Sequence, residues 1–190
     1  MLRRETNEKR LGPQSLVIPE PVLIIGTYNE DGTPNAMNAA WGGVADYNQI
    51  FISLSEHKTT KNIRRLNAFT VSFATKEYMA ACDYVGLVSG NKVPDKVERA
   101  GFHAVKSKLV VAPIFKELPV TLECVVDSFS RKTGILIGNI VNVSVDSKVM
   151  TRGKVDLNKL QPLIYDGLNH NYNVIGEKVG DAFKEGKKIK

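Results

Sequence analysis

Cysteine, aromatic residues and long apolar runs are all scarce in this sequence of 190 residues. The two cysteines, Cys82 and Cys124, lie far apart and outside any C-x-x-C pattern, which argues against a disulfide framework or a structural zinc site. Aromatic residues make up 7% of the chain and do not alternate with basic residues, so we expect no nucleic-acid partner. No apolar run approaches the ~20 residues needed to cross a bilayer. The charged N-terminus also lacks a signal-peptide core, so we expect a cytoplasmic protein without membrane contact.

Familiar catalytic motifs are also missing. The sequence contains no P-loop, H-E-x-x-H or G-x-G-x-x-G pattern and no arrangement typical of a nucleophilic triad. The three histidines, His57, His103 and His170, are scattered, so no metal site is expected. We assign no catalytic side chain, and a cofactor would carry the difficult chemical step if the protein is an enzyme.

The net charge of +6 comes mainly from the two ends of the chain. Basic residues gather there as Arg3, Arg4, Lys9 and Arg10 and as Lys184, Lys187, Lys188 and Lys190. Charge runs at chain ends are usually solvated. We therefore expect a polar N-terminal arm over residues 1–14 and a basic tail over residues 183–190.

Between these ends the pattern is mainly β with short helices. Residues 22–28 and 34–41 read as strands joined by the Asp31-Gly32 turn, and residues 49–54 and 68–74 as two more strands. We expect Gly42-Gly43 to break the second strand and to let backbone or a ligand approach closely. A second β block covers residues 120–145, and short helices are expected at 76–87 and 94–100. This order predicts a meander that begins a barrel.

A polar corner follows the strand at residues 49–54. Ser55, Lys58, Thr59 and Thr60 stand where the pattern changes from strand to helix. Free N–H groups and the positive end of a helix dipole form an anion site, so this corner could hold a phosphate monoester. The alternative is a helix capped by Thr59 or Thr60 above an ordinary solvated basic face.

Several motifs in order resemble a known family. The segments are Asn38-Ala39-Ala40-Trp41, then Phe51-Ile52-Ser53-Leu54-Ser55 with Lys58-Thr59 and Asn62-Ile63, then Asp83-Tyr84, Gly86 and Ser89-Gly90 with Lys96, and Tyr172 with Ile175-Gly176. Together they resemble the flavin reductase-like, FMN-binding split-barrel family, in particular its flavoredoxin branch. The resemblance covers residues 15–182, which we take as the split-barrel domain.

The resemblance implies a six-stranded split β-barrel with Greek-key connections, usually a homodimer with FMN near the subunit interface. It also implies roles for particular residues: Asn38 to Trp41 border the flavin ring, Ser53 to Ser55 line the ribityl chain, and Lys58 and Thr59 hold the phosphate. The full set of cofactor-binding residues implied in this way is Asn38, Ala39, Ala40, Trp41, Ser53, Leu54, Ser55, Lys58, Thr59, Asn62, Ser89, Lys92 and Lys96.

The function that follows from the resemblance is an FMN-dependent oxidoreductase. It would be an NAD(P)H:flavin reductase or a flavoredoxin-type electron transfer protein, with NADH or NADPH as electron donor and a small molecule or protein as acceptor. One alternative is an FMN-binding electron carrier without its own NAD(P)H activity. Another is a barrel that binds pyridoxal phosphate or haem instead of a flavin.

Overall fold

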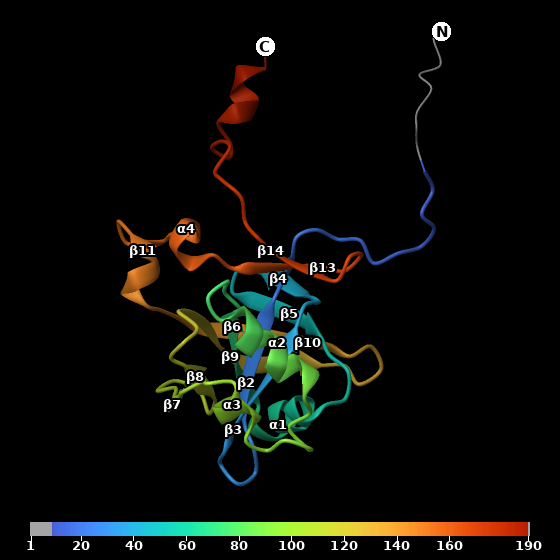
Figure 1. Cartoon of the computed structure of the whole chain (residues 1–190), viewed down its shortest axis with the longest axis vertical. Helices are drawn as coiled ribbons and strands as arrows, with labels where there is room; N and C mark the ends of the chain where they lie inside the picture. The colour runs from blue at the N-terminus through green and yellow to red at the C-terminus, as the bar shows by residue number, and fades with distance from the viewer. Residues whose placement is uncertain (1–8, 190) are drawn as a thin grey trace.

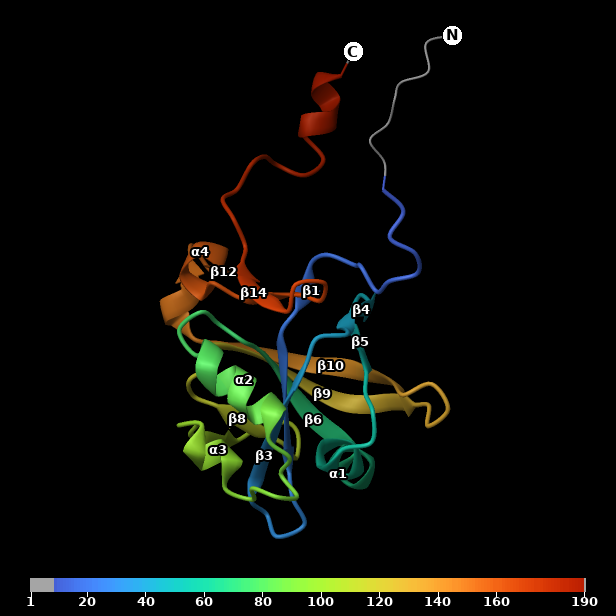
Figure 2. The ribbon, with the colours of Figure 1, turned by 45° about the vertical axis from the view of Figure 1, so that its right-hand side comes forward.

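The structure is a computed structural model that describes residues 9–189. The predicted arm (1–14) and tail (183–190) therefore lie partly outside the described residues, and these boundaries stay predictions. Residues 9–19 and 175–189 leave the body on the same side in both views (Figures 1 and 2). No helix within the described part is long and apolar enough to cross a membrane.

The body is built on one antiparallel sheet with the strand order β3-β2-β6-β9-β10-β5-β4. Its strands are β2 (Leu23–Tyr28), β3 (Pro34–Ala39), β4 (Gly42–Asp46), β5 (Gln49–Ser53), β6 (Ala68–Phe73), β9 (Val120–Phe129) and β10 (Ile135–Val145). Strands β3 and β4 stand at opposite edges of this order, yet only Ala40 and Trp41 separate them in the chain. The chain thus passes from one edge to the other and closes the sheet into a split barrel. Counted as one bent strand, β3 and β4 give the six strands that were predicted.

The connections follow a Greek key, as expected. After β5 the chain forms helix α1 (Lys58–Leu66) and then returns as β6 beside β2, on the far side of the order. The β9–β10 hairpin completes the barrel because β10 pairs with β5, with Leu136 opposite Ile52. Helix α1 therefore lies at one end of the barrel, next to the β2–β3 hairpin (Figure 2).

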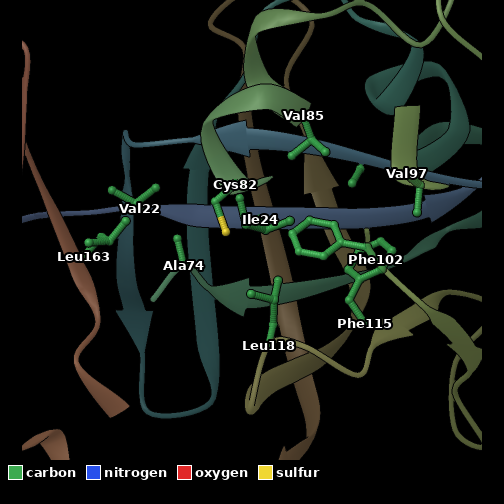
Figure 3. Packing of buried hydrophobic residues seen from close by; sticks show 11 residues of the cluster. Val22, Ile24, Ala74, Cys82, Val85, Val97, Phe102, Phe115, Leu118 and Leu163 are labelled. Carbon is green, nitrogen blue, oxygen red and sulfur yellow. The ribbon is translucent and has the colours of Figure 1, made fainter. Parts of the chain in front are cut away.

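Two hydrophobic cores share strand β2. Leu23 and Ile25 point into the barrel interior, whereas Val22 and Ile24 point outward. The outer core lies between the sheet and two short helices, α2 (Met79–Leu87) and α3 (Lys96–Arg99) (Figure 3). Because both faces of β2 are covered, its sequence is a continuous apolar run and not an alternating one.

The second strand ends at Ala39, just before the Gly42-Gly43 pair, and the chain comes close to its neighbours at this pair as predicted, but the pair also begins a new strand that was not predicted. Strand β4 begins at Gly42, whose backbone passes so close to its neighbours that a Cβ there would lie 2.9 Å from Leu23 Cδ1 and 3.0 Å from the Phe51 carbonyl oxygen. The glycines therefore let the strand bend across the barrel at a point where a side chain would not fit.

The remaining elements are short. A three-stranded sheet has the order β1-β13-β14, formed by β1 (Glu20–Pro21), β13 (Leu163–Asp166) and β14 (Asn171–Val174). The others are β7 (Ala104–Lys106), β8 (Pro113–Phe115), η1 (Ser147–Val149), β11 (Met150–Thr151), β12 (Lys154–Val155), α4 (Leu157–Leu160) and η2 (Glu185–Lys188). The β13–β14 hairpin lies across the top of the body in Figure 1, and the Tyr172 hydroxyl joins it to Asp83 in the middle of α2, so the polar, aromatic tail covers part of the molecule.

Candidate functional site

A polar cavity of about 270 Å³ lies where the start of α1, strand β3 and the segment after α2 meet. Its walls are formed by Asn35, Met37, Asn38, His57, Lys58, Thr59, Val85, Gly86, Leu87, Val88, Ser89, Gly90 and Lys96. Three of these side chains are basic or imidazole groups, and no Asp or Glu is among them. A cavity with this balance of charge suits an anion.

The start of α1 supplies one side of the cavity. His57 is the N-cap residue, and its backbone N–H donates to the Thr60 hydroxyl at 2.8 Å. The Thr60 hydroxyl thus takes part in capping α1. The Thr59 hydroxyl accepts a hydrogen bond from Asn35 Nδ2 at 2.8 Å, so its own hydrogen can be donated into the cavity. The predicted alternative, a helix capped by Thr59 or Thr60, is wrong in that neither threonine is the N-cap residue. The anion site stays a prediction.

The segment after α2 supplies the opposite side. Lys58 Nζ donates to the Gly90 carbonyl oxygen at 3.1 Å, which links α1 to this segment. A Cβ at Gly90 would lie 2.5 Å from Asn35 Oδ1, and a Cβ at Gly86 would lie 2.7 Å from the Asn38 Cβ. Glycine at both positions therefore allows the segment to lie directly against β3 and to form a narrow cavity.

Lys96 completes this side from α3. Its side chain is buried, and its Nζ donates to the carbonyl oxygens of Val85 and Val88 at 2.8 and 2.9 Å. Burial, together with the nearby positive charge of Lys58, lowers the pKa of Lys96 to about 8. The cavity is thus bordered by two ammonium groups, one of them in an unusually poor environment for a positive charge.

A second cavity of about 260 Å³ adjoins the first. It shares Asn38, Gly86 and Leu87 with the polar cavity, and it is also lined by Val22, Ala40, Asp83, Tyr165 and Tyr172. The Tyr172 hydroxyl donates to Asp83 Oδ1 at 2.6 Å. Burial and this hydrogen bond raise the pKa of Tyr172 to about 12. The two cavities adjoin at these shared residues, and we call the pair together the trough, which is basic at the α1 end and more aromatic at the β14 end.

A comparison with known protein families matches residues 15–172 to the flavin reductase like domain. The match covers most of the chain. The protein belongs to the flavin reductase-like family. Its mainly β structure, with a curled antiparallel sheet and short helices, is the split barrel of that family.

Solved structures agree with this placement. The flavoredoxin of Desulfovibrio vulgaris (Miyazaki F) is 34% identical, with a TM-score of 0.89 over 94% of this chain and 99% of that one. A flavoredoxin from Methanosarcina acetivorans is 28% identical, with a TM-score of 0.86 over 96% of this chain and 100% of that one. An FMN-binding domain of a flavin reductases-like enzyme from Shewanella baltica OS155, at 18% identity, shares the fold with a TM-score of 0.77 over 85% and 89% of the two chains.

The structure brings several predicted cofactor-binding residues of this family member together. Asn38, Lys58, Thr59, Ser89 and Lys96 line the polar cavity, and Ala40 lines the second one. The side chains of Ala39 and Leu54 lie in the barrel core instead. Five others do not line either cavity, namely Trp41, Ser53, Ser55, Asn62 and Lys92.

Two of the predicted residues that line neither cavity are Asn62, which is buried, and Trp41, which is exposed. Asn62 is buried, and its Nδ2 donates to Thr27 Oγ1 at 3.1 Å and to Asn29 Oδ1 at 2.9 Å, so it fixes α1 against the β2–β3 hairpin. Trp41 is 56% exposed beside the bend between β3 and β4 and lines neither cavity. Asn62 thus holds the helix that borders the polar cavity, whereas the Trp41 side chain is exposed at the surface.

Sequence reasoning did not select some residues that the structure places at the site. Asn35, His57 and Gly90 line the polar cavity, and Asp83 and Tyr172 line the second cavity. Asn35 carried one usable signal, since a second amide three residues before Asn38 is unusual in a strand. The pairing of Asp83 with Tyr172 joins positions 89 residues apart and had no local signal.

Proposed function

We propose that this protein is an FMN-dependent oxidoreductase whose polar cavity holds the phosphate of the flavin nucleotide. The observation that supports this most strongly is the meeting of Lys58, Thr59 and Lys96 around a cavity without carboxylates, in a member of the flavin reductase-like family. FMN carries a phosphate monoester, and ammonium groups and hydroxyl donors are the partners that such a dianion requires. The residues present therefore fit the group.

Each residue has a distinct part in this proposal. Lys58 and Thr59, at the first turn of α1, bind the phosphate with an ammonium group and a hydroxyl donor, and the helix dipole adds to the attraction. Asn38 lies at the junction of the two cavities, where its amide can bind polar atoms of the flavin. Ala40 lines the second cavity, and in this proposal the flavin ring lies there, next to the β3–β4 bend.

Bound FMN would supply the redox chemistry by accepting electrons from NADH or NADPH and passing them to a small molecule or a protein. The side chains around the trough bind and orient and need not transfer protons. Tyr172 stays protonated over the physiological range because its pKa lies near 12, so it can donate a hydrogen bond but cannot act as a base. Cys82 lies on α2 with its side chain buried in the outer core, and burial raises its pKa to about 12, so its thiol is no nucleophile.

A second candidate function is an FMN-binding electron carrier without its own NAD(P)H activity. The similarity to two flavoredoxins over nearly their whole length favours keeping this alternative. A carrier would show bound FMN and rapid reduction by a protein donor, with no consumption of NADH or NADPH.

We also propose that the protein is a cytoplasmic homodimer. Large apolar side chains are exposed near the β3–β4 bend, among them Trp41, Val44 and Tyr47, and they would be expected at an interface. An apolar groove of about 520 Å³, lined by residues that include Gly42, Val143 and Leu163, adjoins the same region. Sedimentation velocity at micromolar concentration should give twice the 21.0 kDa mass of one chain.

The test of the function is a spectrum followed by two titrations. The purified protein, or the protein mixed with FMN, should show flavin absorption bands that are shifted from those of free FMN. Addition of NADH or NADPH should then bleach these bands. Lack of FMN binding at micromolar concentration would contradict the proposal, whereas binding without bleaching by either nucleotide would favour the carrier.

A further inference from the structure

The C-terminal segment, residues 176–189, stands away from the body of the protein (Figures 1 and 2). Among residues 9–189, no hydrogen bond or ion pair joins this segment to the rest of the chain. Its charged side chains pair with one another instead, as Lys178 and Lys184 do with Asp181. The segment is therefore held by contacts within itself, and the body of its own subunit does not cover it.

Three apolar side chains of the C-terminal segment are exposed to an unusual extent. Val179 is 94% exposed, Phe183 95% and Ile189 84%. Single exposed apolar residues are normal on a protein surface, but three in one short segment, one of them aromatic, indicate a binding surface. We expect Phe183 to be the main anchor, because aromatic side chains contribute the largest buried areas at interfaces.

The apolar groove of about 520 Å³ has the chemistry that suits such side chains. Within the described part of the chain, every residue that lines it is Pro, Gly, Val, Leu, Ile or Phe. Val120 and Leu122 on β9, Val143 on β10, and Leu157 and Leu160 on α4 form its walls. A groove without polar groups gains free energy by covering apolar side chains and offers no partner to a polar ligand.

The groove and the root of the C-terminal segment lie side by side on one subunit. Ile175, directly before the segment, lines the groove, and Gly42 lines it next to the exposed Trp41. The segment itself runs away from the body in both views, and none of its residues lines this groove (Figures 1 and 2). A two-fold axis near Ile175 would bring the root of the same segment on a second copy next to the groove, and the contact would form twice.

The exposed apolar area is of the size that a stable dimer needs. An interface of standard size buries about 1,200–2,000 Å² in total. Phe183 and the fully exposed Tyr47 can each bury about 150–250 Å². Because symmetry counts each residue twice, these two aromatic side chains alone give about 600–1,000 Å². Val44, Val179 and the walls of the groove supply the remainder.

We propose that the C-terminal segment of each subunit packs in the apolar groove of a second copy of this chain, with Phe183 as its anchor. The inference rests on the proposed homodimer and is independent of the flavin. It adds to that proposal which segment joins the two subunits and where it binds. Because the segment crosses from one subunit to the other, its release from the groove should separate the subunits and leave each barrel folded.

The first test compares Phe183→Asp with Leu109→Asp by sedimentation velocity over a range of concentrations. Leu109 is 59% exposed between β7 and β8 and does not line the groove, so it is a matched control for an exposed apolar residue. We expect Phe183→Asp to raise the dissociation constant of the dimer at least about a hundredfold, since a buried aromatic contact is lost twice. Leu109→Asp should sediment as the wild type does.

The second test shows which subunit supplies the segment. Phe183→Cys and Leu157→Cys, made in separate chains and co-expressed, should be joined by a short bis-maleimide reagent into a product of twice the 21.0 kDa mass. Neither chain carries both new thiols, so a 183–157 link found by mass spectrometry must connect two copies. The native cysteines are buried and should not react. Phe183→Cys co-expressed with Leu109→Cys is the control and should give no 183–109 link.

Three results would overturn the inference. A dimer of undiminished affinity in Phe183→Asp would do so, and so would an intact dimer without the 183–157 link. A link within one chain of the double variant Phe183→Cys, Leu157→Cys, with none between the co-expressed chains, would place the segment in its own groove. A wild type that stays monomeric at every concentration would overturn the proposed homodimer together with this inference, whereas flavin binding by that monomer would leave the proposed oxidoreductase function standing.

Discussion

The Tyr172 hydroxyl on β14 donates a hydrogen bond to Asp83 on α2 across 2.6 Å and so joins the C-terminal hairpin to the wall of the trough. The two residues are 89 positions apart in the chain. The bond is partly buried, and its acceptor is a carboxylate. It therefore fixes β14 to α2 beside the second cavity, which both residues line.

Removal of this bond should loosen the hairpin without unfolding the barrel. We predict that Tyr172→Phe lowers the free energy of unfolding by about 1 kcal/mol, discounted because Asp83 is partly exposed. Denaturant unfolding of Tyr172→Phe, Asp83→Asn and the double variant would measure the coupling. Hydrogen exchange at residues 171–174 should quicken in each variant. Additive losses in the double variant would show that the two side chains do not stabilise each other.

The Lys58 side chain is expected to contribute directly to flavin affinity. We predict that Lys58→Ala weakens FMN binding by about tenfold or more, since one charge-assisted contact to the phosphate is lost. Lys61→Ala, one turn further along α1 at an exposed position, should bind FMN as the wild type does. Flavin fluorescence titrations would compare them. Equal affinity in Lys58→Ala and wild type would place the phosphate somewhere other than the start of α1.

Gly86 sets the distance between α2 and β3. In Gly86→Ala the new methyl group would lie 2.7 Å from the Asn38 Cβ, so α2 must move away from the sheet. We predict a loss of about 1–3 kcal/mol in unfolding free energy and weaker flavin binding. Gly176→Ala is the control, because nothing lies within 4 Å of its added Cβ. Thermal unfolding of both variants checks this, and equal melting temperatures would contradict the packing described here.

The buried carboxyl group of Glu123 makes the stability of the folded state depend on pH in a direction that its surroundings determine. Burial raises the pKa of its carboxyl group, but hydrogen bonds from Ser107, Ser144 and Asn142 outweigh burial and leave that pKa below its ordinary value. The ionised form therefore stabilises the folded state above the unfolded pKa of about 4.3, and this contribution is lost as the pH falls through the lowered value.

We predict that Glu123→Gln is destabilised by about 1–3 kcal/mol at pH 7, because an amide cannot accept all three hydrogen bonds. The difference from wild type should shrink as the pH is lowered below about 4, where the wild-type carboxyl group also becomes protonated. Urea unfolding at several pH values would measure it. A difference that stays constant from pH 7 to pH 3 would contradict the assigned role of the ionised carboxylate.

Much of the barrel could be predicted from local patterns. The Asp31-Gly32 turn lies between β2 and β3 as expected, and Gly32 has a φ of 80°, which its lack of a Cβ permits. Strand β4 was missed because a glycine pair usually ends a strand, and here the close approach of Leu23 and Phe51 selects glycine within one. The glycine pair predicted a close approach, but the pattern could not name the neighbours, because Leu23 and Phe51 meet Gly42 only in the folded chain.

At the candidate site, too, some residues could be predicted from local sequence and others depend on how distant elements pack. The position of Lys58 and Thr59 at the start of α1 was predictable, because helix starts and hydroxyl residues are local signals. The burial of Lys96 and the contact between Gly90 and Asn35 depend on how α2 and α3 pack against β3. Ser53 and Ser55 had the right chemistry in the sequence, but neither lines the cavity.

The central claim, that this cavity grips the phosphate of FMN, is tested most directly by the ratio of the dissociation constants for riboflavin and FMN at pH 7. Two charge-assisted contacts from Lys58 and Lys96 predict that FMN binds at least about a hundredfold more tightly than riboflavin. Equal affinity for the two flavins, or no measurable binding of FMN, would contradict the account.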